Sequence, residues 1–277
     1  MTDKLCIEDR QVSATSPEGK TATMPIDAFL AKVAPSAIAG QWLMLPDGVK
    51  AVARQGAVIV WVYEQFPCVH NFLWIASDSP SRFGKGTKYR SVRIALPHVI
   101  MLAVFVPDPS GQLQLSSCNE CFFRNGPLKS WDDELCFPAL LNCSKFTPDD
   151  GRPLAWICTQ HLGRVGLVRE ADANKRLCAG FEALRRCLFE TGFNYSSEHH
   201  EGASWFSESR KIDSRISTVE NWEAATAADP LFVLEVPWLA TGRTLRAVTE
   251  RIFKNTGATN GRFNSAAALA RVVFNHK

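Results

Sequence analysis

The chemistry that the sequence suggests centres on one thiol, that of Cys158, in the segment PLAWICTQHL (Pro153–Leu162). A cysteine reacts as its thiolate, and an unperturbed thiol, with a pKa of about 8.5, is only slightly ionised near neutral pH. That fraction is enough when the electrophile is itself a thioester, because exchange of one sulfur for another is nearly isoenergetic. Cys158 is therefore a candidate nucleophile for thioester exchange. The alternative is that it is a small core residue, as buried cysteines commonly are.

Two polar residues near Cys158 are candidates to assist it. Asn142 ends the segment FPALLN, and its carboxamide is a donor suited to the carbonyl oxygen when an amine attacks a thioester. A donor of this kind is typically worth ~10²–10³ in rate. His161 follows Cys158 by three residues, close enough to influence the thiol within a turn. We therefore expect a catalytic set of Cys158, Asn142 and His161.

Other thiols and imidazoles compete with this interpretation. Cys143 directly follows Asn142 and is a rival nucleophile that the spacing leaves open. A cysteine-protease activity is a further alternative, and it would need a base such as His161 or His199 beside the thiol. His199 and His200 lie together in a polar loop, but the side chains of adjacent residues point apart. The remaining cysteines have no partner in sequence or fall on or beside a predicted core stripe: Cys6, Cys68, Cys178 and Cys187.

A structural zinc site is the alternative use of four cysteines in the middle of the chain. Cys118 and Cys121 have two residues between them, which is a familiar spacing for zinc ligands. Cys136 and Cys143 have six residues between them, which is awkward for two ligands on one turn. Because Phe122 follows directly and suggests a strand, we expect no metal, with zinc on these four thiolates kept as the alternative.

The composition is that of an ordinary globular protein. Of the 277 residues, 46% are hydrophobic and 21% are charged, which allows a sizeable core and argues against disorder. The formal net charge is only +3, and Lys and Arg are scattered rather than clustered. This pattern argues against nucleic acid or an anionic membrane as a partner.

The sequence also bears on location. The start, MTDKLCIEDR, is too charged for a secretory signal. The most apolar run, ALPHVIMLAVFVP, is interrupted by Pro97 and His98 and is well short of the ~20 residues needed to cross a bilayer. We expect a soluble, cytoplasmic protein whose nine cysteines are core residues, ligands or nucleophiles rather than disulfides.

The order of the elements predicts an α+β fold, an antiparallel meander packed by helices. The first 25 residues are polar and are expected to form a loose hairpin or arm, and a short helix follows over 24–34. From Gln41 to Arg124, β-branched and aromatic runs alternate with turn compositions, which favours consecutive antiparallel strands over a βαβ order. The predicted strands are 41–45, 57–63, 68–76, 89–95, 98–106 and 112–116.

Helical patterns dominate after Cys158. Leu177, Phe181, Leu184 and Leu188 recur at spacings of four, three and four, which predicts one apolar stripe on a helix within 171–193. Gly192 is placed to end that helix. Three more helices are predicted over 217–228, 244–253 and 262–274.

The order of these parts resembles the ubiquitin-conjugating enzyme family. In that family a short helix precedes an antiparallel meander, a His-Pro-Asn segment, a cysteine in a motif of the type G-x-[IV]-C-L-x-x-L, and further helices. FPALLN would stand for the first segment and GRPLAWICTQHL for the second. The chain is most similar to divergent bacterial members encoded beside ubiquitin-activating-like and JAB-protease-like genes, of which PRTRC system protein B is one.

The resemblance covers roughly Gln41 to Gly192 and implies an activity. Cys158 would accept a ubiquitin-like protein from a ubiquitin-activating-like enzyme as a thioester and pass it to an amine of a protein substrate. Asn142 would stabilise the oxyanion, no cofactor is required, and the pathway would be a bacterial ubiquitination-like one, of the kind used in antiphage defence. The chain departs from the family in two ways: no His precedes Pro138, and Asn142 precedes Cys158 by sixteen positions, about double the usual gap.

These expectations divide the chain into three parts: an N-terminal arm and short helix (1–40), a conjugating-enzyme-like core (41–192) and a helical extension packed on the core (193–277). The competing interpretation is not enzymatic. In it the chain is an interaction or scaffold module of a multi-protein complex, stabilised by zinc or by its apolar core alone.

Overall fold

The computed structural model has a mixed α+β architecture in which most strands are antiparallel, and the predicted fold class is confirmed at that level. The residues described are 4–33, 44–80, 86–108, 111–140, 142–145, 153–159, 172–190, 192–193, 205–256, 269–270 and 273–274. They form two compact units. The smaller contains the described parts of Met1–Trp42, Arg54–Val58 and Phe253–Lys277, and the larger those of Leu43–Ala53 and Ile59–Ile252.

The N-terminal residues of the smaller unit form a three-stranded sheet; the expected hairpin is present as β2–β3, but it is packed in this sheet rather than loose. The antiparallel order is β1-β2-β3, and the two-residue turn between the first strands places Asp9 and Arg10 at positive φ (46° and 59°). Val12 and Ala14 are fully buried on one face, an alternation too short and too polar at its edges to stand out in sequence. The elements are β1 (Lys4–Glu8), β2 (Gln11–Thr15), β3 (Thr21–Pro25) and α1 (Ile26–Val33).

The core of this unit combines both ends of the chain. Val12, Met24 and Phe29 pack in one cluster with Ala270 and Val273, which are 1% exposed. The described residues near the C-terminus, 269–270 and 273–274, are helical, as the predicted helix over 262–274 requires of them. The N-terminal sheet therefore depends on residues some 250 positions away in sequence.

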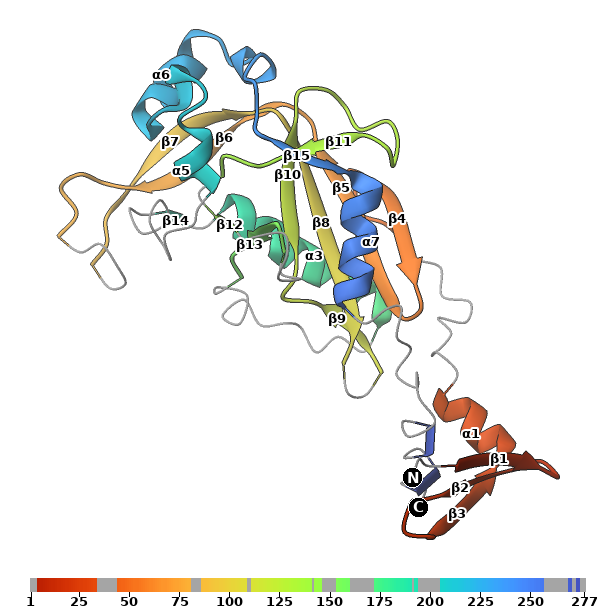
Figure 1. The fold of residues 1–277 in the computed structure, drawn as a ribbon. Coiled ribbons are helices and arrows are strands. Elements are labelled where there is room, and N and C mark those ends of the chain that lie inside the picture. The colour runs from red at the N-terminus through yellow and green to blue at the C-terminus, as the bar shows by residue number, and fades with distance from the viewer. Residues whose placement is uncertain are drawn as a thin grey trace. The chain divides into compact units, whose positions relative to one another are not determined.

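The larger unit is built on a curled nine-stranded sheet (Figure 1). Its main path runs β12-β13-β10-β8-β5-β4, and β9, β11 and β15 pair off this path. The pairings β5–β8, β8–β10, β10–β13 and β13–β12 are antiparallel. The strands are β4 (Val49–Gln55), β5 (Val58–Gln65), β8 (His98–Pro107), β9 (Leu113–Leu115), β10 (Glu120–Arg124), β11 (Glu134–Cys136), β12 (Cys143–Lys145), β13 (Ala155–Ile157) and β15 (Ala240–Thr244).

Two prolines divide what the sequence predicts as one continuous meander. The β5–β8 ladder ends at the pair Gln65–Val99, and the β6–β7 ladder continues in the same register from Cys68, so Pro67 falls opposite Pro97. Proline has no N–H to donate, so the ladder stops there and the hairpin passes into a second sheet. That sheet has the order β14-β6-β7, with β6 (Cys68–Ile75), β7 (Tyr89–Leu96) and β14 (Gly192–Phe193).

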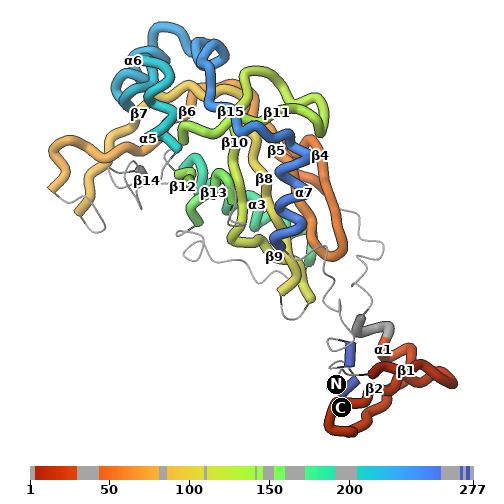
Figure 2. Tube along the Cα trace, in the orientation of Figure 1, coloured from red at the N-terminus to blue at the C-terminus, as the bar shows by residue number. Residues whose placement is uncertain are grey.

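Two helices contact opposite faces of the nine-stranded sheet (Figures 1 and 2). The predicted stripe of α3 (Ala173–Phe189) is buried, and the ring of Phe181 lies 5.9 Å from Trp61 and 5.4 Å from Tyr63. α7 (Leu245–Asn255) contacts the other face, where Arg251 pairs with Glu120. Side chains alternate along a strand, so the partners of α3 and α7 come from alternate positions.

The segment after residue 204 supplies α5 (Trp205–Ser209), η3 (Ser214–Ile216), α6 (Val219–Ala228) and η4 (Phe232–Leu234). α6 packs on β7, where the indole of Trp222 donates to the carbonyl of Ala95 (2.9 Å) and Thr226 accepts from the N–H of the same residue (2.9 Å). Each helix whose residues are described is too short or too polar to span a bilayer.

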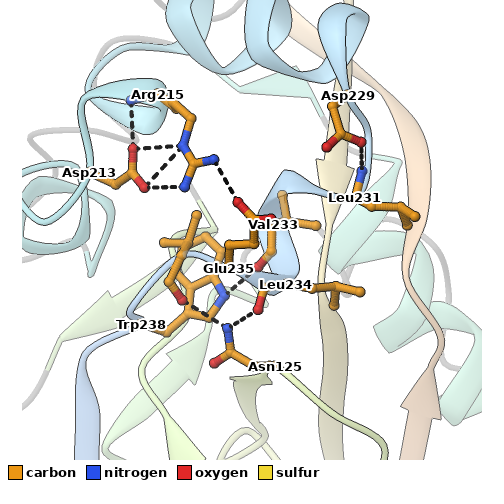
Figure 3. A network of polar contacts seen from close by, with 10 residues as sticks. Asn125, Asp213, Arg215, Asp229, Leu231, Val233, Leu234, Glu235 and Trp238 are labelled. Carbon is orange, nitrogen blue, oxygen red and sulfur yellow. Dashed lines mark hydrogen bonds and ion pairs between the residues drawn. The ribbon is translucent and has the colours of Figure 1, made fainter.

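A polar network fixes the chain between α6 and β15 (Figure 3). Asn125, just after β10, donates to the carbonyls of Leu234 and Val236, at 2.7 and 2.8 Å. The indole of Trp238 donates to the carbonyl of Val233 (3.0 Å). The remaining contacts are Arg215–Asp213 (2.8 Å), Arg215–Glu235 (3.2 Å) and the N–H of Leu231 to Asp229 (2.9 Å).

The shared core of the smaller unit predicts that its N-terminal sheet fails when the C-terminal contribution is damaged. We expect Val273→Asp to unfold β1–β3, because a carboxylate without a partner is not tolerated in an apolar core. Limited proteolysis should then cut within residues 4–33 at least about tenfold faster, the change that 1.4 kcal/mol produces in an equilibrium. The control is Ile7→Asp at a position 55% exposed; equal cleavage of the two variants would contradict the shared core.

Candidate functional site

The β12–β13 hairpin brings Asn142 and Cys158 together. Its register pairs Cys143 with Ile157 and Lys145 with Ala155, and one step further the N–H of Cys158 donates to the carbonyl of Asn142 (3.0 Å). Asn142 and Cys158 are sixteen positions apart in sequence, and the pairing of β12 with β13 brings them together at the open end of the hairpin.

The backbone around Cys158 is held by the start of β10. The N–H of Ile157 donates to the carbonyl of Asn119 (2.9 Å), and the Asn119 side chain accepts from the N–H of Val104 in β8 (2.9 Å). One step along, the carboxylate of Glu120 accepts from the N–H of Leu154 (3.0 Å). Asn119 and Glu120 are almost fully buried, so the thiol-bearing segment is fixed to the interior of the sheet.

The side chain of Asn142 links this hairpin to the last turn of α3. Its Nδ2 donates to the carbonyl of Cys187 at 2.6 Å and lies 3.5 Å from the carbonyl of Cys158. The same amide that the sequence suggests as an oxyanion donor therefore bonds backbone carbonyls in this state. To reach a substrate oxygen it would have to turn away from at least one of them.

Burial separates the two rival nucleophiles. Cys158 is half-buried, whereas Cys143 is 1% exposed. Burial, together with contact with the Cys121 thiol, raises the pKa of the Cys143 thiol well above its ordinary value. A thiol that is neither ionised nor accessible is a poor nucleophile, which leaves Cys158 as the better candidate.

A third thiol lies beside Cys158. Burial, and next the charge of a Cys158 thiolate, raise the pKa of Cys187 to about 11. Cys187 is 2% exposed on the inner side of α3, as its place beside the predicted stripe suggests. The backbones of the two cysteines are neighbours, because the Nδ2 of Asn142 contacts the carbonyls of both. The imidazoles of the sequence hypotheses, His161, His199 and His200, lie outside the described residues.

The four cysteines of the zinc alternative do not gather as one ligand group. Cys121 and Cys143 are buried and in contact, Cys118 is exposed, and Cys136 lies in β11 opposite Phe123. Within the residues that the structure describes, no group of three or more His, Cys, Asp or Glu side chains is arranged to hold a metal ion.

Two buried ionic contacts were missed from the sequence. Glu120 is 1% exposed and pairs with Arg251 of α7; burial raises its pKa, and the nearby guanidinium opposes that shift. On the same face, Glu64 accepts from Nδ1 of His98 (2.8 Å) and lies 3.9 Å from the ammonium of Lys50. The sequence did contain one sign of these contacts, a charged residue inside an otherwise apolar strand. Such a residue needs a partner when it is buried, but the spacing of apolar residues does not identify that partner.

Comparison of the chain with protein-family models, with curated proteins and with solved structures finds no match. The chemistry of the site is therefore argued from its own residues: a half-buried thiol at the end of β13, an amide 3.5 Å from the backbone carbonyl of the same cysteine, and a buried carboxylate that holds the segment before it.

The buried pair beneath the site predicts a large coupling energy. Glu120→Leu should lower the free energy of unfolding by ~3–5 kcal/mol, because it leaves the Arg251 guanidinium without its carboxylate. Glu120→Leu combined with Arg251→Leu should lose clearly less than the sum of the single variants, with a coupling of ~0.5–3 kcal/mol in urea unfolding. Additive losses would show that the pair is not coupled. The exposed pair Asp132–Arg246 serves as the control and should give additive effects.

Proposed function

We propose that the protein is a conjugating enzyme for a ubiquitin-like protein, with Cys158 as the thioester-forming residue. The observation that carries the proposal is the setting of this thiol: half-buried, at the end of β13, next to Asn142, while the rival thiol of Cys143 is buried. The partners would be a ubiquitin-activating-like enzyme, the modifier and a substrate amine, in a bacterial ubiquitination-like pathway.

The order of the elements supports a conjugating-enzyme-like core. Four strands that are adjacent in the sheet also follow one another along the chain: β4, β5, β8 and β10. They are interrupted by the short β9 and by β6 and β7, which form the far end of the central hairpin, the long hairpin made of β5–β6 and β7–β8. The thiol-bearing segment comes next, and α3 then packs on the sheet behind it. This order is the one that the family resemblance implies, an argument by analogy that the chemistry of the site must complete.

In the first step the Cys158 thiolate attacks the thioester carbonyl of the modifier held by the activating enzyme. The new carbon–sulfur bond forms, and the activating enzyme's thiolate leaves. In the second step an uncharged amine attacks the Cys158 thioester, the carbon–sulfur bond breaks, and the amine loses its proton to the surrounding water or a nearby base. An oxyanion forms in both steps, and a positioned amide such as that of Asn142 would stabilise it.

Asn142 has a place in this scheme that differs between the two steps. Thioester exchange between sulfurs is nearly balanced and needs little assistance, whereas attack by an amine has the higher barrier. The amide lies 3.5 Å from the backbone carbonyl of Cys158, the residue whose sulfur would carry the acyl group. His161, three residues after Cys158, is kept in the proposal as a residue that influences the thiol.

A charging assay tests the assignment of the nucleophile. The protein is mixed with a bacterial ubiquitin-activating-like enzyme, a ubiquitin-like protein and ATP, and the adduct is resolved on non-reducing gels. We expect an adduct that a thiol reductant removes, none with Cys158→Ala, and a reductant-resistant ester with Cys158→Ser. The matched control, Cys143→Ala, should charge normally. An adduct that survives Cys158→Ala would overturn the assignment, and a well-folded protein that never charges would favour the scaffold interpretation.

The role of Asn142 is tested by separating charging from discharge. We expect Asn142→Ala and Asn142→Asp to charge with the modifier but to discharge to an amine about 10²-fold more slowly, because neither side chain offers the amide donor. Both variants also lose the bond to the Cys187 carbonyl, so their thermal stability is measured alongside. Charging and discharge that fall together, in proportion to lost stability, would leave Asn142 with a purely structural role.

A further inference from the structure

The end of β13 and the last turn of α3 meet at two cysteines. Cys158 directly follows β13, and Cys187 lies in the last turn of α3, which ends at Phe189. Asn142 bridges them, since its one amide nitrogen is 2.6 Å from the carbonyl of Cys187 and 3.5 Å from that of Cys158. The backbones of the two cysteines are therefore neighbours, although 29 positions separate them in sequence.

The two thiols are unequal in a way that suits a redox pair. Cys158 is half-buried, whereas Cys187 is 2% exposed. The amide of Asn142 contacts the backbone carbonyls of both cysteines, and the charge of a Cys158 thiolate is, after burial, the second cause of the raised pKa of Cys187. When a partly exposed thiol lies near a buried one, the first is the one that an oxidant attacks and the second can condense with it.

We propose that Cys158 and Cys187 form a reversible disulfide when the protein meets a hydroperoxide. The Cys158 thiolate attacks one peroxide oxygen, the oxygen–oxygen bond breaks, and a sulfenic acid forms while hydroxide (or alkoxide) leaves. The Cys187 thiol then attacks the sulfenic sulfur, so that a sulfur–sulfur bond forms and water leaves after a proton transfer. The peroxide is reduced by two electrons, which the two thiols supply, and a dithiol restores both thiols by exchange.

The disulfide would control the site that the proposed function assigns to Cys158, and this consequence rests on that function. The oxidised sulfur cannot accept an acyl group, so thioester formation stops until the bond is reduced. A disulfide needs Cα atoms about 4.4–6.8 Å apart, and the bond would form at the place where Asn142 contacts the backbones of both cysteines. The amide of Asn142 would then lie at both the proposed thioester chemistry of Cys158 and the disulfide that stops it.

Peptide mapping tests the pair without any conjugation partner. The reduced full-length protein is treated with hydrogen peroxide, free thiols are blocked with N-ethylmaleimide, and the protein is digested without reductant for mass spectrometry. We expect a peptide linking Cys158 to Cys187, two of the nine thiols protected from the blocking reagent, and loss of the link with dithiothreitol. Oxidation of Cys158 to sulfinic acid with no link, or a link between other cysteines, would overturn the proposal.

Variants separate a specific pair from general oxidation. Cys187→Ala should give a Cys158 sulfenic acid that dimedone traps, with no cross-link, whereas Cys178→Ala on the same helix should cross-link like the unaltered protein. A cross-link lost in both variants would also count against the pair. Should Cys187→Ala fail to fold, the map of the unaltered protein decides alone. Because this readout needs no activating enzyme, a missing link and a missing thioester are distinguishable failures.

Discussion

The carboxylate of Glu120 is the contact on which the arrangement of the larger unit depends. It joins three parts of the chain: β10, which carries it; the segment before β13, whose Leu154 N–H it accepts; and α7, which supplies Arg251. A buried carboxylate is costly unless it is paired and hydrogen-bonded, and burial accordingly raises its pKa while the guanidinium opposes the shift. Through this carboxylate the thiol-bearing hairpin is tied to α7, and the two members of the ion pair, Glu120 and Arg251, lie 131 positions apart in sequence.

The opposed prolines have a complementary effect at the other end of the sheet. By stopping the ladder between Gln65 and Cys68, they let one hairpin serve two sheets without a change of register. The first sheet receives α3 and α7, and the second receives α6 through the Trp222 and Thr226 contacts to Ala95. The late helices thereby pack on strands formed early in the chain, so the larger unit extends from residue 43 to residue 252.

The features that depend on residue spacing could be predicted from the sequence, whereas contacts between residues far apart in the chain could not. The stripe of α3, the strands of the central hairpin and the α+β class follow from spacing and side-chain type, because those properties act locally. The packed three-stranded sheet at the N-terminus was not predicted, because two of the six buried residues of its core, Ala270 and Val273, come from the other end of the chain. For the candidate site, the proximity of Asn142 to Cys158 was expected from a family resemblance. Its cause is the pairing of two three-residue strands, β12 and β13, and strands this short have no recognisable pattern in the sequence. The bond to the Cys187 carbonyl and the buried Glu120–Arg251 pair are likewise long-range and could not be read from spacing.

The geometry at Asn142 limits what the site can do at one moment. A carboxamide nitrogen has two hydrogens, and here two backbone carbonyls, of Cys187 and Cys158, are the acceptors within reach. Stabilising an oxyanion would require the amide to give up one of these bonds. The bond to the Cys187 carbonyl, in the last turn of α3, is the shorter of the two and is therefore the stronger. Any catalytic use of the amide is thereby coupled to the end of α3, where the buried thiol of Cys187 also lies. The same turn would thus influence both the reactivity of Cys158 and its protection.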